Sequence, residues 1–150
     1  IAVFGQKDYQ QLAIIKQLVR DLSYPIDIIG APIVRANDGL ALSSRNQYLS
    51  ASERQIAPVL HQELQRLAHQ LTSSKLSQQE ADSLLAQTQT RINEAGFTVD
   101  YLEIKTDELN NITESAAFNT ENKNLIILVA AWLGRARLLD NQLVAVNRPL

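Results

Sequence analysis

The chain begins with Ile1-Ala2-Val3-Phe4-Gly5-Gln6-Lys7-Asp8, an apolar run that ends at a glycine and continues into a polar turn. Consecutive apolar residues of this kind are typical of a strand buried in a parallel sheet. Asp8 and Gln11 are placed to cap a helix, and a second strand, 26–29, follows Pro25. The opening therefore predicts a right-handed βαβ unit of a doubly wound sheet. One face of its helix carries apolar residues at helical spacing: Leu12, Ile15, Val19 and Leu22.

The same opening leads us to expect that the chain is a fragment. It starts inside an apolar strand, without an initiator methionine or a lead-in. A strand of this kind needs neighbouring strands on both sides, which the first residues alone do not supply. We place a domain boundary near Pro32, so that 1–32 ends a first domain and 33–150 forms a small second one.

Two helices in the second domain are predicted by Ser-x-x-Glu capping boxes, Ser50 with Glu53 and Ser77 with Glu80. In each box the serine and the glutamate satisfy each other's free backbone N–H groups. Pro58 lies inside the first helical pattern, where it should bend the helix or leave an early turn without its hydrogen bond. Before these helices, 30–46 is rich in Gly, Pro, Asn, Asp and Ser, which indicates an ordered loop.

Strands follow the helices. The segment 99–105 alternates like a half-buried strand, 125–132 is apolar throughout, and 138–144 is interpreted as a hairpin with Asp140-Asn141 as its turn. The second domain is therefore predicted to be α+β, with two helices on an antiparallel three-stranded sheet. We interpret 106–124 as a long connection.

The composition excludes several classes of protein. The formal net charge of the 150 residues is −2, with both signs mixed along the chain, so we expect neither a nucleic-acid partner nor a membrane surface. The longest apolar run, 125–133, is about half of the roughly 20 residues that a membrane helix needs. Because there is no cysteine, disulfides and thiolate chemistry are excluded. We expect a cytoplasmic protein.

A first candidate site is Gly5-Gln6-Lys7-Asp8, at the turn where open α/β sheets bind nucleotides beyond the carboxyl ends of their strands. Glycine lets the backbone approach a phosphate, and Lys7 adds a mobile positive charge. The stretch matches neither the Walker A pattern nor the dinucleotide fingerprint, so these residues alone leave a purely structural turn open.

A second candidate is Leu42-Ser43-Ser44-Arg45. Two hydroxyl groups and a guanidinium can donate several hydrogen bonds to one phosphate, and arginine can do so with two parallel bonds. A helix-capping segment with a solvated arginine is the alternative. Two such segments in one chain favour the functional interpretation.

These two segments lie within stretches that resemble the pantothenate synthetase family. The stretches are FGQKDYQQL (4–12), GAPIVRANDGLALSSRNQYL (30–49), IAP (56–58) and LVAAWLGRARLLDN (128–141). The resemblance covers the chain apart from 73–76, 106–124 and the last few residues. It implies an α/β fold in which the end of a Rossmann-like nucleotidyltransferase domain is followed by a small α+β lid domain.

The resemblance also implies an activity. The family condenses pantoate with β-alanine at the expense of ATP, accompanied by Mg²⁺, through a pantoyl-adenylate that is formed with release of pyrophosphate and consumed with release of AMP. Carried over by position, Gln11 contacts pantoate, and no residue binds a metal. The implied catalytic residues are Lys7, Ser43, Ser44 and Arg45. The implied ATP contacts are Gly5, Gln6, Lys7, Asp8, Val34, Leu42, Ser43, Ser44 and Arg45.

The sequence departs from the family in two respects. Gln6 stands where the family often has glutamate, and the M-G-x-L-H-x-G-H signature, whose histidines bind ATP phosphates, is absent from these residues. We therefore expect little or no ligase activity from the chain alone, and a homodimer for the full-length protein. Two alternatives stay open: another adenylate-forming nucleotidyltransferase, with 42–45 in the part of a mobile KMSKS-type loop, and a non-catalytic lid module.

Overall fold

The first unit of the fold is a βαβ arrangement, as predicted. The computed structural model describes residues 1–73, 76–110 and 124–144. Strand β1 (Ala2–Gly5) leads through a short 3₁₀ turn, η1 (Gln6–Asp8), into helix α1 (Tyr9–Asp21), and strand β2 (Ile28–Ala31) returns parallel to β1. The apolar strand and the helical spacing of α1 together account for this unit. Strand β2 starts two residues later than predicted.

The face of this small sheet that points away from α1 carries exposed apolar side chains. Val3 is 61% exposed and Ile29 is 48% exposed, because strand residues alternate between the two faces and α1 covers only one of them. On the covered face Gly30 allows close packing, since a Cβ atom there would lie 2.8 Å from the Leu12 side chain. A parallel sheet is ordinarily covered on both faces.

Helices of the second unit begin where the capping boxes predict them. Helix α2 (Ala51–Ile56) is capped by Ser50 and helix α4 (Gln78–Glu94) by Ser77, and in both cases the reciprocal glutamate bond is present. Pro58 interrupts the first helical pattern completely, so that α3 (Val59–Ser73) is a separate helix. The interruption follows from the missing N–H and the bulk of the proline ring. Gly96 ends α4 with a φ of 113°, as expected of a C-terminal glycine.

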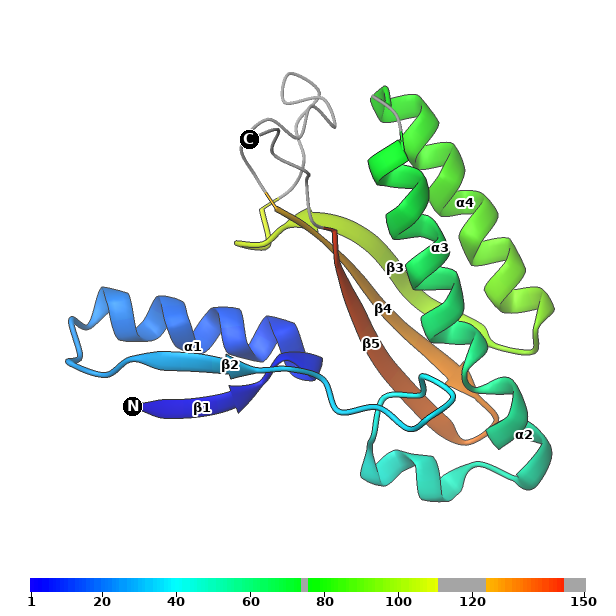
Figure 1. Ribbon diagram of the computed structural model, residues 1–150, viewed down its shortest axis with the longest axis horizontal. Helices are drawn as coiled ribbons and strands as arrows, with labels where there is room; N and C mark the ends of the chain where they lie inside the picture. The colour runs from blue at the N-terminus through cyan, green and yellow to red at the C-terminus, as the bar shows by residue number, and fades with distance from the viewer. Residues whose placement is uncertain (74–75, 111–123, 145–150) are drawn as a thin grey trace.

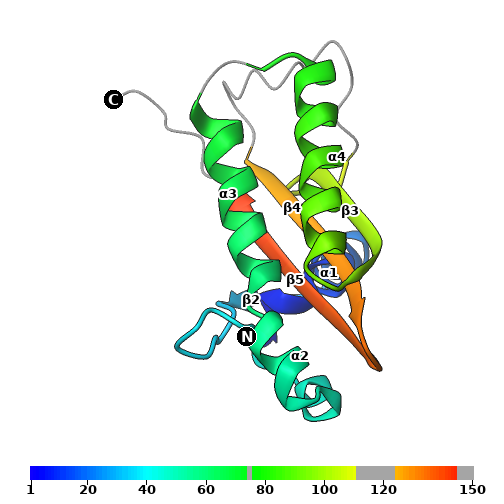
Figure 2. The ribbon, with the colours of Figure 1, turned by 90° about the vertical axis from the view of Figure 1, so that its right-hand side faces the viewer.

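Three antiparallel strands complete the fold: β3 (Thr98–Thr106), β4 (Leu125–Leu133) and β5 (Ala136–Val144), in the order β3-β4-β5. Helices α3 and α4 cover one face of this sheet, and the βαβ unit lies on its other side (Figure 1). Viewed along the perpendicular direction, α3 and α4 stand in front of the strands, with α1 behind them (Figure 2). The mixed α/β class and the two-helix, three-stranded arrangement are confirmed.

Strand β4 is the centre of the core because both of its faces are buried. Ile127, Val129 and Ala131 pack into the cluster formed with the helices, whereas Ile126 and Leu128 alternate onto the opposite face and are also buried. A strand that is buried on both sides has to be apolar at nearly every position, and 125–131 meets that condition. The apolar run identified in the sequence is thus the strand on which both layers pack.

The predicted hairpin within 138–144 is wrong. The turn between β4 and β5 is at Gly134-Arg135, and Asp140 and Asn141 lie inside β5, paired with Val129 and Leu128. Asp and Asn favour turns because their side chains bond to nearby backbone. Here both side chains instead have tertiary partners, which favour the strand.

Two other predictions have limits. Asp8 stands at the N-cap position of α1 but makes no side-chain capping bond, so the predicted cap is wrong. The predicted connection 106–124 falls largely on 111–123, outside the described residues. The domain division at residue 32 stays a prediction. In the described part of the chain, no helix has the length and apolar character needed to cross a membrane.

We expect Gly134→Ala to destabilise the fold. Gly134 has a φ of 55°, which costs an L-residue about 1–2 kcal/mol, and a Cβ atom there would collide with the Glu53 carboxylate. The free energy of unfolding, measured by urea denaturation, should fall by at least that amount. Gly5→Ala is the matched control, because Gly5 has a φ of −70° and no atom within 4 Å of its would-be Cβ. Equal stability of the two variants would contradict this account of the hairpin.

Candidate functional site

The two segments singled out in the sequence lie next to each other. The Lys7 Nζ atom is 3.5 Å from the carbonyl oxygen of Leu42, although 35 residues separate them in the chain. The distance is longer than a good hydrogen bond, so the ammonium group stays available to another acceptor. The structure thus brings the Gly5–Asp8 turn and the 42–45 segment to one place.

The loop before the second segment is held in a hairpin-like shape. Arg35 and Ala41 form an isolated antiparallel bridge, and the Leu42 amide donates to the Val34 carbonyl at 2.9 Å. Gly39 makes the reversal possible with a φ of 94°, a conformation that glycine adopts at little cost. Val34 and Leu42 consequently lie side by side, and both are more than half exposed.

Ser43, Ser44 and Arg45 follow at the start of the 3₁₀ helix η2 (Ser44–Tyr48). The Ser43 side chain accepts a hydrogen bond from the Arg45 amide at 3.2 Å and so caps this helix. Ser44 and Arg45 are exposed. Within residues 1–73, 76–110 and 124–144 the Arg45 guanidinium has no partner. Ser43 therefore has the helix-capping role that was the alternative for this segment. The Arg45 side chain has no partner among the described residues and is available to a ligand.

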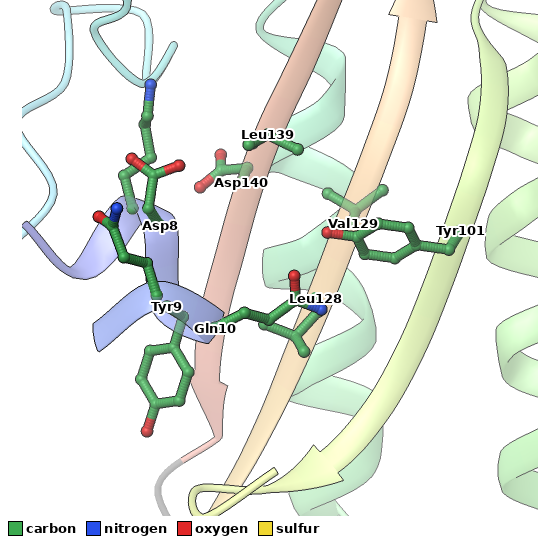
Figure 3. A pocket seen from close by; sticks show the side chains of 10 residues that line it. Asp8, Tyr9, Gln10, Tyr101, Leu128, Val129, Leu139 and Asp140 are labelled. Carbon is green, nitrogen blue, oxygen red and sulfur yellow. The ribbon is translucent and has the colours of Figure 1, made fainter. Parts of the chain in front are cut away.

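A cavity of about 150 Å³ lies between the start of α1 and the face of the sheet that is turned away from α3 and α4 (Figure 3). Asp8, Gln10 and Gln11 line it from the helix side, and Leu128 and Tyr101 from the sheet side. Gln11, the residue that sequence resemblance assigns to pantoate, thus faces a space of small-molecule size.

A β-bulge at Asp100 turns Tyr101 towards this cavity. Val99 is opposite Ala131, but Tyr101 is opposite Ala130, so the extra residue moves Tyr101 to the face away from the helices. Figure 3 shows its ring reaching from β3 across β4. Burial raises the pKa of the Tyr101 hydroxyl; the Arg137 charge opposes the increase, and nearby carboxylates, among them Asp8, add to it. The hydroxyl is therefore neutral and able to donate a hydrogen bond.

A buried polar cluster behind the two segments was missed in the sequence. Asp140, only 3% exposed at its side chain, accepts two hydrogen bonds from Arg35, at 2.7 and 2.8 Å. Asn141 donates from Nδ2 to the carbonyl oxygens of Gln6 and Lys7, at 2.8 and 3.0 Å. The available signal was a polar pair between apolar residues, which is unusual where a strand is buried, but the turn preference of Asp-Asn concealed it.

His61 of α3 joins this cluster without a hydrogen bond. Its Nδ1 atom is 3.7 Å from Asp140 Oδ2 and is buried without a partner in the described residues. Burial and the nearby Arg35 charge lower the pKa of His61, and Asp140 opposes them. The imidazole is therefore held neutral. No group of three metal-ligating side chains is found among the residues that the structure describes.

Comparison with known proteins identifies the family. The family described as Pantoate-beta-alanine ligase matches residues 1–143. This chain belongs to the pantoate-beta-alanine ligase family. The pantothenate synthetase of Psychrobacter arcticus is 67% identical over the whole chain, and the chain spans about half the length of this curated relative, 50%. The resemblance expected from the sequence motifs is confirmed.

Solved structures of this ligase family have the same fold. The Thermus thermophilus pantothenate synthetase matches with a TM-score of 0.78 and 38% identity, over 94% of this chain and 48% of its own. The Francisella tularensis pantoate-beta-alanine ligase matches with a TM-score of 0.59 and 29% identity, over 94% of this chain and 42% of its own; it is described as complexed with Beta-gamma ATP and Beta-alanine.

The neutral state of His61 predicts a pH dependence of stability. Because the folded-state pKa lies below the ordinary value of 6.5, the unfolded chain binds the proton more readily, and stability is lost as pH falls through that value. The free energy of unfolding should therefore decrease more between pH 7.5 and 5.5 in the wild type than in His61→Gln. His69→Gln, an exposed histidine on the same helix, is the matched control and should behave like the wild type. If the free energy of unfolding decreases equally with pH in the wild type and in His61→Gln, the assignment of a neutral His61 in the folded chain is contradicted.

Proposed function

We propose that the protein containing this chain condenses pantoate with β-alanine in an ATP-dependent reaction that passes through pantoyl-adenylate. The observation that carries the proposal is the approach of Lys7 to Leu42, which unites the two phosphate-binding segments of a chain that belongs to the ligase family. Because the chain spans half of the Psychrobacter relative's length, the activity is assigned to the longer protein.

In the first step, a pantoate carboxylate oxygen attacks the α-phosphorus of ATP, and pyrophosphate leaves. Negative charge grows on the phosphate oxygens in the transition state, and fixed positive donors stabilise it most where water is excluded. Lys7 and Arg45 are the cations at the two segments, and Ser43 and Ser44 add hydroxyl donors. The family resemblance and the geometry both favour these four as the groups that act on the phosphates.

The remaining assigned residues surround those donors. The exposed apolar pair Val34 and Leu42 offers a surface for the adenine ring, and the Gly5–Asp8 turn offers backbone to the phosphates. Gln11 lines the 150 Å³ cavity, where its amide can bond to pantoate. The phosphate-binding donors and the cavity lined by Gln11 adjoin along the η1 turn. A reaction between two bound substrates requires such neighbouring sites.

Mg²⁺ enters the proposal together with ATP. The ion binds mainly through substrate phosphates, waters and one or two carboxylates, so that a dedicated protein cage is not required. We assign no side chain of this chain to the ion, in line with the family resemblance. When bound, the ion would offset phosphate charge.

In the second step the amine of β-alanine attacks the acyl carbon of pantoyl-adenylate, and AMP leaves. This step depends on placing an uncharged amine against an activated carbonyl and calls for no nucleophilic side chain. The Francisella tularensis ligase, complexed with Beta-gamma ATP and Beta-alanine, supports both substrates. We further propose that the longer protein is a cytoplasmic homodimer and that the chain alone has little or no ligase activity.

We expect Lys7→Ala and Arg45→Ala each to lower kcat/KM for ATP by about 10²-fold or more, since each removes a preorganised charge from the transition state. The measurement is AMP release by the full-length protein that contains this chain, with pantoate and β-alanine present. Lys16→Ala, an exposed lysine on α1 outside both segments, is the matched control and should retain wild-type activity.

Different results would remove different parts of the proposal. AMP release with another acid but not with pantoate would overturn the substrate assignment and leave the adenylate chemistry. Wild-type rates in both variants would remove the phosphate role of the two segments. Full activity of the 150-residue chain by itself would contradict the need for further residues.

A further inference from the structure

Neighbouring residues of β5 hold the two phosphate-binding segments from opposite sides. Asn141 reaches the backbone of the η1 turn, at Gln6 and Lys7. Asp140 binds Arg35, at the base of the loop that continues into Leu42. Turn and loop are far apart in the sequence, and their common point of attachment is one dipeptide in the third strand of the sheet.

The strand geometry explains how one dipeptide holds both the η1 turn and the loop. Successive side chains of a strand point to opposite faces. Asp140 is opposite Val129, whose side chain packs with the helices, and it therefore meets His61 and Arg35. Asn141 is opposite Leu128, on the cavity side, and it therefore meets the turn.

The chemistry of the turn requires an amide at position 141. Two consecutive carbonyl oxygens, at Gln6 and Lys7, converge on one nitrogen, and an asparagine NH₂ group supplies the two donors they need. Aspartate would place an oxygen against two oxygens. Asn141 is itself 5% exposed, so water does not readily replace it.

We propose that Asn141 is a positioning residue for ATP activation: its two hydrogen bonds fix the backbone that carries Lys7 and so set the distance between Lys7 and the 42–45 segment. This inference rests on the proposed function. Asn141 touches no substrate in this account and acts only through the turn. Arg35 complements it by donating to the Gly39 carbonyl at 3.1 Å while bound to Asp140, which fixes the loop on the other side.

The test separates the two half-reactions in the full-length protein. In Asn141→Ala, pantoate-dependent exchange between pyrophosphate and ATP should fall by about tenfold or more, because small displacements of a preorganised group have large kinetic effects. Aminolysis of preformed pantoyl-adenylate by β-alanine, which involves no pyrophosphate, should stay within about twofold of the wild type. A purely structural loss would lower both half-reactions alike. Gln142→Ala truncates the adjacent amide, which among the described residues bonds only to the Leu143 carbonyl, and should leave both half-reactions unchanged.

A double variant tests whether Asn141 acts through Lys7. If it does, Asn141→Ala should have little further effect on exchange in a Lys7→Ala background, since coupled residues are not additive. Additive losses, equal losses in both half-reactions, or wild-type exchange in Asn141→Ala would each overturn the proposal.

Failure of the proposed function would be recognised separately. If the wild type and Gln142→Ala show no pantoate-dependent exchange, the ligase assignment falls. Whether Asn141 fixes the backbone of the η1 turn is then decided by amide hydrogen exchange in the 150-residue chain. Asn141→Ala should accelerate exchange at residues 6–9 and leave β4 as in the wild type. Unchanged protection of residues 6–9 would overturn the positional role.

Discussion

The buried ion pair between Arg35 and Asp140 is the contact on which the position of the loop after the βαβ unit depends. It joins the loop that leaves the βαβ unit to the edge strand of the antiparallel sheet with two short hydrogen bonds. The side chain of Asp140 is 3% exposed and that of Arg35 is 20% exposed. Charges taken this far out of water are tolerated only when they are paired, so the pair strongly disfavours any arrangement that separates loop and strand.

Several features of the site follow from this pair. The Asp140 carboxylate is already neutralised by Arg35, so it does not need a proton on His61, which burial keeps neutral. The Asp140 carboxylate also accepts a hydrogen bond from the backbone N–H of Asn141 at 2.8 Å. This bond orders the neighbouring residue. The same short stretch of β5 therefore fixes both the loop, through Arg35, and the position of the η1 turn. A second contact, from the Tyr9 hydroxyl to the Asp107 carbonyl at 2.9 Å, fixes α1 against the end of β3.

Much of the fold could be predicted because the signals are local. The Ser50 and Ser77 boxes set helix starts through bonds within one turn of chain, and the apolar run at 125–131 requires a doubly buried strand. The hairpin predicted at 138–144 failed because the turn preference of Asp140-Asn141 is also local, and distant partners outweigh it. The predicted Asp8 cap is wrong because the residues before α1 form a 3₁₀ turn, in which the Asp8 side chain makes no capping bond. The bulge at Asp100, which moves Tyr101 to the cavity, leaves no distinct pattern in the residue types.

The sequence by itself determined the family, the mixed α/β class and the residue types of the two candidate phosphate-binding segments, because motifs and short-range periodicity are written in consecutive residues. Only the tertiary structure decided that Lys7 meets Leu42, that Gln11 and Tyr101 share a cavity, and that Asp140 and Asn141 hold the two segments together. Those relations join residues 35 to 135 positions apart. The contacts of Asp140 and Asn141 arise from the burial of their polar groups, each of which requires a partner that the neighbouring sequence does not provide.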